Sequence, residues 1–110
     1  MAYDHELADR VRDLLSGVDG VSEKRMFGGL AFLVHGNMAV AASSQGGLLV
    51  RVEPDEGERL LGGEVQPMVM RGREMPGWLR VGATALRTPD QLSAWVDRGV
   101  SYARALPAKA

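Results

Sequence analysis

The chain has 110 residues, 45% hydrophobic and 25% charged, a composition typical of one globular domain and unlike that of a disordered segment. Its formal net charge of −1 gives no overall attraction to nucleic acid or to an anionic membrane, so an electrostatic partner requires a local patch. The absence of cysteine excludes disulfides, thiolate catalysis and zinc sites built on sulfur.

The first residues and the hydropathy predict a cytoplasmic protein with no membrane association. "MAYDHELADR" lacks the basic start and the apolar stretch of a signal peptide. No apolar run approaches the ~20 residues that a helix needs to span a bilayer.

An amphipathic helix is predicted over residues 4–16, with Asp4 at the N-cap and Gly17 as the C-terminal stop. Three strands are predicted next. Residues 27–34 are almost continuously apolar, and Gly36-Asn37 predicts a tight turn into a second strand over residues 38–42. "SSQGG" predicts the turn before a third strand, "LLVRVE", whose one face carries Leu48, Val50 and Val52.

The second half predicts a short helix, a strand pair and a long helix. Pro54 suits the first position of the short helix, which ends before two glycines. Residues 66–71 and 78–81 are predicted strands joined by "GREMPG". Thr88-Pro89-Asp90-Gln91 has the form of a capping box that opens the long helix, which reaches Leu106.

This order, α-β-β-β-α-β-β-α, predicts an α+β fold in which helices flank a five-stranded antiparallel sheet. The sequence shows no repeat and no linker, so we expect one domain over residues 1–110 with an ordered core of about residues 4–106.

The pair Gly28-Gly29 raises the question of a phosphate-binding loop. Such a loop needs a helix N-terminus directly after the glycines, whereas here the predicted strand "LAFLV" follows. We interpret the glycines as structural, allowing a bulge, a positive φ or close packing against the adjacent helix.

No catalytic, cofactor or metal site is predicted. His5 and His35 have no ligand-like spacing, and His35 beside Gly36-Asn37 is interpreted as a solvated turn residue. The acidic residues around the short helix complement its dipole, which suffices to explain Glu53, Asp55, Glu56 and Glu58. We therefore expect a protein that is not an enzyme and needs no cofactor.

A basic patch is the most unusual local feature. Between residues 71 and 87 only Glu74 opposes four arginines, Arg71, Arg73, Arg80 and Arg87. Arginines in this density suit an acidic protein surface or DNA phosphates, and the alternative is a solvated hairpin. Met68 and Met70 share one face of their strand, and core packing is favoured over a binding surface for them.

Three blocks together resemble the TfoX/Sxy N-terminal domain family: "RMFGGLAFLVHGNMAV", "GLLVRV" and "PMVMRGREMPGWLRV". The likeness extends over about residues 7–109. Its most specific positions are the motif residues Met26, Phe27, Gly28, Gly29, Gly72, Arg73, Met75, Gly77 and Trp78. We interpret these positions as structural, except Arg73 and Trp78.

The resemblance implies a fold like that of the secretion chaperones and a role without catalysis. The founding members of the family regulate natural competence as transcriptional co-activators. Longer members carry a helical C-terminal domain, so the sequence is interpreted as a stand-alone N-terminal domain.

Two hypotheses follow. The first is a regulatory interaction domain that contacts a transcription factor or a polymerase subunit, with direct DNA binding as a weaker variant and a homodimer as a further expectation. Its candidate interaction residues are Arg71, Arg73, Trp78 and Arg80. The alternative is a binding or catalytic domain for a small anionic ligand, held beside the Gly28-Gly29 bend by Lys24, Arg25 and Arg73.

Overall fold

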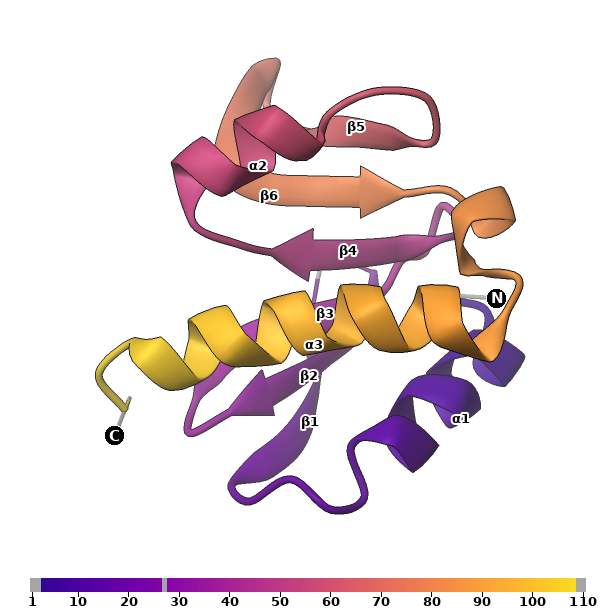
Figure 1. Ribbon diagram of the computed structural model, residues 1–110, viewed down its shortest axis with the longest axis vertical. Coiled ribbons are helices and arrows are strands. Elements are labelled where there is room, and N and C mark those ends of the chain that lie inside the picture. The colour runs from indigo at the N-terminus through magenta and orange to yellow at the C-terminus, as the bar shows by residue number, and fades with distance from the viewer. Residues whose placement is uncertain (1–2, 27, 109–110) are drawn as a thin grey trace.

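One antiparallel sheet of six strands organises the part of the chain that the computed structural model describes, residues 3–26 and 28–108 (Figure 1). The strands follow the order β1-β2-β3-β4-β6-β5 across the sheet. Their bounds are β1 Val21–Met26, β2 Gly29–Val34, β3 Asn37–Ala42, β4 Leu48–Arg51, β5 Val65–Met70 and β6 Arg73–Val81. The fold is α+β as predicted, with six strands in place of five.

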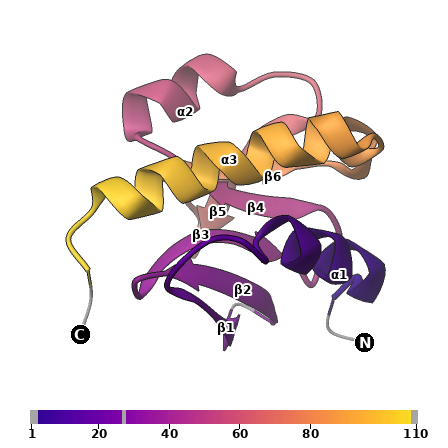
Figure 2. The ribbon, with the colours of Figure 1, turned by 60° about the horizontal axis from the view of Figure 1, so that its bottom comes forward.

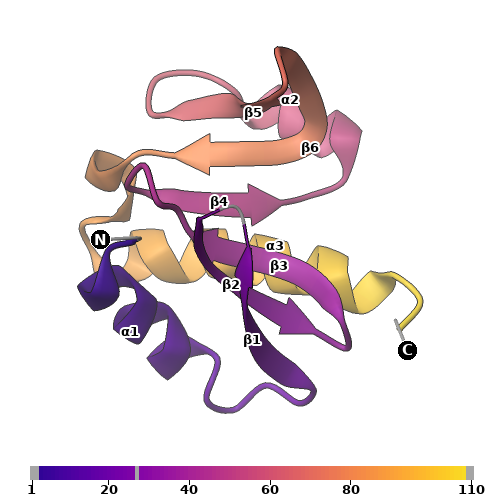
Figure 3. The ribbon, with the colours of Figure 1, turned by 180° about the vertical axis from the view of Figure 1, so that it is seen from behind.

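The helices lie on one face of the sheet, as the view in Figure 2 shows. α3 packs on β3 and β4, α2 packs on β6, and α1 contacts β3 and α3. The helix bounds are α1 His5–Leu14, α2 Pro54–Leu60 and α3 Pro89–Ala105, with a short 3₁₀ helix, η1, at Ala83–Leu86. Seen from behind, the opposite face of the sheet has no helix over it among the described residues (Figure 3). We call it the helix-free face.

The N-termini of the helices confirm the predicted caps, whereas α1 ends at Leu14 with Leu15 as its C-cap, before the predicted stop at Gly17. The Asp4 carboxylate accepts the backbone N–H of Leu7, and Thr88 and Gln91 form both hydrogen bonds of the capping box. Pro54 occupies the first turn of α2, as predicted. These caps satisfy N–H groups that have no partner within the helix, which fixes where each helix starts.

The main core lies between the helices and the sheet. Strand alternation brings Leu48, Val50 and Val52 to this side, as predicted, against the apolar stripes of α1 and α3. Gly99 lets α3 approach closely, since a Cβ there would collide with the carbonyl oxygen of Ala39. Ala39 is the extra residue of a β-bulge in β3, because Phe32 pairs with Val40 and Leu33 with Met38.

Three sequence-based boundaries are wrong. The strand β1 was not predicted, because its polar residues 22–25 offer no apolar face. The β2–β3 turn is His35-Gly36, and Asn37 is instead a buried strand residue. The predicted "GREMPG" connection is only the two-residue turn Arg71-Gly72, since β6 already begins at Arg73.

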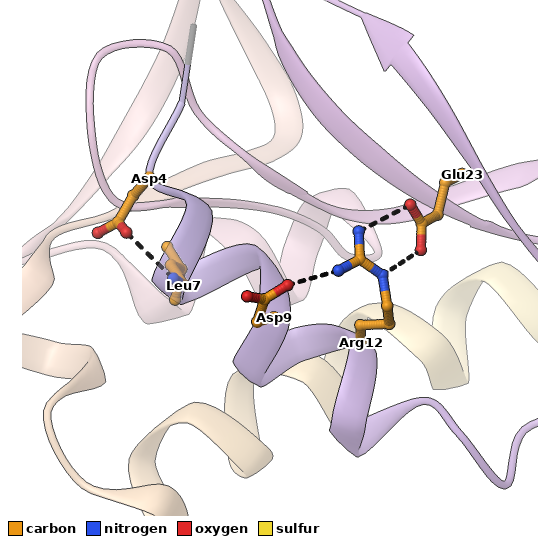
Figure 4. A network of polar contacts seen from close by, with 5 residues as sticks. All are labelled: Asp4, Leu7, Asp9, Arg12 and Glu23. Atoms are coloured by element: carbon orange, nitrogen blue, oxygen red, sulfur yellow. Dashed lines mark hydrogen bonds and ion pairs between the residues drawn. The ribbon is translucent and has the colours of Figure 1, made fainter. Parts of the chain in front are cut away.

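A salt-bridge network fastens the edge strand β1 to α1 (Figure 4). The Arg12 guanidinium donates two hydrogen bonds to the Glu23 carboxylate, at 2.6 and 2.9 Å, and a third to Asp9 at 2.6 Å. The hydrogen bond from Arg12 lowers the pKa of Glu23, although partial burial opposes the shift. The bidentate pair therefore orients an exposed strand that has little apolar packing of its own.

Candidate functional site

The β5–β6 hairpin presents the predicted arginines. Its turn residues Arg71 and Gly72 have φ values of +54° and +79°, the left-handed pair that a type I′ turn requires. Arg71 is exposed at the hairpin tip, and Arg73 opens β6 opposite Met70. Arg87 is exposed after η1, away from the hairpin in sequence.

Alternation along β6 assigns Trp78 and Arg80 to the helix-free face. Leu79 and Val81, which alternate with them, belong to the main core on the other side. Arg80 pairs with Leu49 of β4, and Trp78 pairs with Arg51 of the same strand. Both Trp78 and Arg80 are partly buried, so they are flanked by neighbouring side chains and are not fully solvated.

The helix-free face has a small apolar cluster of its own. Its buried floor consists of Ala31, Met38, Ala41, Leu49 and Met68, and partly buried residues packed on the floor are Met26, Met70, Met75 and Trp78. Every methionine that the structure describes lies in this cluster. The prediction that Met68 and Met70 share one face is confirmed, and three further methionines join them. This gathering was not evident from the sequence, because it depends on the order of the strands.

The sheet brings distant strands to this cluster. β1 and β5 are its two edges, yet Met26 from β1 and Met70 from β5 pack on the same floor. The strand direction turns steadily between β6 and β1 in Figure 1, as expected of a twisted sheet. The cluster on the helix-free face therefore contains residues from all six strands.

Arg51 fixes the position of Trp78 at one end of this face. Its guanidinium carbon lies 5.0 Å from the centroid of the Trp78 ring and 5.5 Å from that of Tyr102 on α3. A cation between two aromatic rings is attracted by both π faces. Arg51 thus links the candidate site to α3, a contact that the sequence analysis missed.

The sequence of the chain matches the profile of a known family. The profile of the TfoX N-terminal domain matches residues 13–103, most of its length. The chain belongs to the TfoX N-terminal domain family. No curated protein and no solved structure matches it.

In the TfoX domain, the two segments that carry its most specific sequence motifs pack on the same cluster. Met26 comes from the first, and Met75 and Trp78 come from the second, about fifty residues later; all three pack on the helix-free cluster. Phe27 and Lys109 lie outside the described residues.

Two of the motif glycines of the TfoX domain, Gly29 and Gly77, lie at close backbone contacts. Gly28 has a φ of +76°, and a Cβ on Gly29 would collide with the carbonyl oxygen of Ala42 in β3. A Cβ on Gly77 would collide with the carbonyl oxygen of Val52. Gly28-Gly29 therefore leads into a strand with the close packing that was expected, although the neighbour is a strand and not a helix.

The anionic-ligand alternative is not favoured by the strand geometry. Lys24 pairs with Ala31 and Arg25 with Leu30, and these partners point to opposite faces of the sheet. Lys24 and Arg25 therefore do not converge. A cavity of about 240 Å³ does lie between α2 and the hairpin, but its charged lining residues are acidic, Glu58 and Glu74.

The remaining candidates are surface residues. His5 and His35 are exposed, and His35 has a φ of +51° in its turn, consistent with a solvated turn residue. Glu53 caps α2 by accepting the backbone N–H of Glu56, which gives this acidic residue a structural role. None of the helices in the described ranges is long and apolar enough to cross a membrane.

Proposed function

We propose that this TfoX domain is a non-enzymatic regulatory module that binds a protein partner through the helix-free face. The partner class that the family resemblance suggests is a transcription factor or a polymerase subunit. The observation that carries the proposal is the convergence of Arg73, Trp78 and Arg80 with Met26 on one face. Partly buried apolar side chains beside arginines are the usual composition of an interaction hot spot.

Direct binding to DNA fits this face less well. Non-specific DNA binding needs many phosphate contacts, while the chain carries a net charge of −1. A single tryptophan, already stacked on Arg51, is a poor platform for unpaired bases. A protein partner makes better use of the methionine cluster.

The test is affinity capture of partners from the native host with the tagged chain and two double variants. Arg73→Glu/Arg80→Glu reverses two charges on the helix-free face. Arg59→Glu/Arg87→Glu makes the same charge change on exposed positions of α2 and of the η1–α3 connection.

A transcription protein captured in near-stoichiometric amount by the wild type and by the control variant, and lost from Arg73→Glu/Arg80→Glu, supports the proposal. Capture that survives the Arg73/Arg80 reversal would move the interaction to another surface. Failure of all three proteins to retain any partner would argue against an interaction module.

A further inference from the structure

Charge is segregated between the two faces of the sheet. Among the described strand residues, the ionisable side chains that the register assigns to the helix-free face are all cationic: Lys24, Arg51, Arg73 and Arg80. Their acidic neighbours Glu23 and Glu74 alternate to the helix side. There Glu23 binds Arg12, and Glu74 lines the cavity beside α2. A chain of net charge −1 thus builds one cationic face.

These cations have little to neutralise them within the chain. Lys24 and Arg73 are exposed, and no ion pair to Lys24, Arg73 or Arg80 is formed by the residues that the structure describes. Glu64, just before β5, lines a small depression together with Arg80 without forming a salt bridge to it. The positive charge is therefore available to carboxylates from outside.

The apolar part of the face can adapt to another surface. Met26, Met70 and Met75 are partly exposed above a buried floor that includes Ala31 and Ala41. Methionine has three rotatable bonds and a polarizable sulfur, so such a layer repacks around the side chains of a ligand at low cost.

We propose that the helix-free face binds an acidic amphipathic peptide segment of the partner protein. The segment's apolar side chains pack on the methionine cluster, and its carboxylates bind Lys24, Arg73 and Arg80. The Arg51 guanidinium packs on the Trp78 ring of the same face. This inference rests on the proposed function and adds the chemistry of the partner to it.

The experiment uses three probes of defined chemistry: a synthetic peptide of about 18 residues made of leucine and glutamate at helical spacing, the same peptide with lysine in place of glutamate, and a mixed-sequence single-stranded oligonucleotide. Binding to the full chain is measured by fluorescence anisotropy. The contact surface is mapped by NMR of protein labelled with ¹³C at the methionine methyl groups.

The acidic peptide is expected to bind and to shift the methyl signals of Met26, Met70 and Met75. Arg73→Glu/Arg80→Glu is expected to weaken its binding about tenfold or more, with Arg59→Glu/Arg87→Glu within about twofold of the wild type. Met70→Gln should also weaken binding. Val69→Gln is its matched control, because Val69 is 58% exposed and alternates to the other side of the same strand. The affinity should fall as salt is raised.

Four results would overturn the inference. Equal affinity for the acidic and basic peptides would mean that the cations do not select the ligand. Preference for the oligonucleotide would make the face a nucleic-acid site. If the free chain sediments as a dimer and the Arg73→Glu/Arg80→Glu variant as a monomer, the occupant of the helix-free face is a second copy of the chain. If the acidic peptide does not bind but Arg73→Glu/Arg80→Glu still loses a host partner, the proposed function stands. The inference that the partner's segment is acidic is then wrong.

Discussion

Gly77 of β6 and Val52 after β4 approach each other backbone to backbone: the Val52 N–H donates to the Gly77 carbonyl oxygen at 2.8 Å. A Cβ on Gly77 would collide with the Val52 carbonyl oxygen, and Gly77 has a φ of +81°. The Cα of Gly77 also lies 3.3 Å from where a Cβ on Gly57 would stand, so α2 seats on β6 at this point. Gly77, which directly precedes Trp78, is thus the residue at which α2, β4 and β6 contact one another.

Gly77→Ala is expected to destabilise the protein by about 3 kcal/mol or more, because the backbone strain and the collision add. Gly72→Ala is the control. Gly72 has a similar φ of +79°, but nothing lies within 4 Å of a Cβ there, so only a backbone cost of about 1 kcal/mol is expected. Urea unfolding of both variants measures the difference. Equal losses of stability in the two variants would mean that the backbone around Val52 can shift away from the added Cβ at no cost in free energy.

Gly29→Ala is expected to destabilise the fold through packing alone, since its φ is not positive and its added Cβ would meet the Ala42 carbonyl oxygen. Larger residues such as valine should cost more. Gly17→Ala, where nothing lies within 4 Å, should be neutral or slightly stabilising. Thermal unfolding of the pair separates a crowded glycine from a free one. A Gly29→Ala protein as stable as Gly17→Ala would show that β2 and β3 can separate without loss.

The sequence predicted the helices better than the edges of the sheet. Caps act locally, and Asp4, Pro54 and Thr88 therefore marked the helix starts correctly. β1 was missed because it is an edge strand whose side chains are mostly exposed, and such a strand needs no pattern of apolar residues. The β2–β3 turn was misplaced by one residue, since Asn37 is buried and donates to the carbonyl oxygen of Pro107, a contact across 70 residues that no local pattern contains.

The candidate site was predicted only in part for the same reason. Arg73, Trp78 and Arg80 stand close together in sequence, so their density was visible. Lys24 and Met26 reach the same face only because the strand order and twist bring β1 and the β5–β6 hairpin to one cluster. Arg51 joins them through the β4–β6 pairing, which skips α2 and β5 in sequence.

Arg73→Ala is expected to leave the melting temperature nearly unchanged, because Arg73 is exposed and forms no ion pair with the described residues. Arg51→Ala should lower it measurably, since Arg51 is partly buried between the rings of Trp78 and Tyr102. Differential scanning calorimetry compares the two. A large loss for Arg73→Ala would make Arg73 a structural residue and remove it from the binding face.

Glu23→Gln is expected to lower the melting temperature at neutral pH but not in acid. The hydrogen bond from Arg12 holds the folded-state pKa of Glu23 below its ordinary value of 4.5. The stabilisation is therefore complete above pH 4.5 and is lost as the pH falls through the lower folded value. Both side chains are more than a third exposed, so the effect should be small and weakened by salt. A difference between wild type and variant that persists unchanged in strong acid would contradict this origin.

Oxidation with hydrogen peroxide is expected to modify Met26, Met70 and Met75 before Met38 and Met68. The first three are partly exposed, whereas Met38 and Met68 are only 3% and 7% exposed. Conversion to the sulfoxide makes an apolar side chain polar, so early oxidation should abolish binding of the acidic peptide while the fold persists. Peptide mapping by mass spectrometry gives the order of modification, and circular dichroism checks the fold. Oxidation of Met38 at the rate of Met75 would show that the floor opens, and retained binding after modification of the outer three would show that the ligand contacts other side chains.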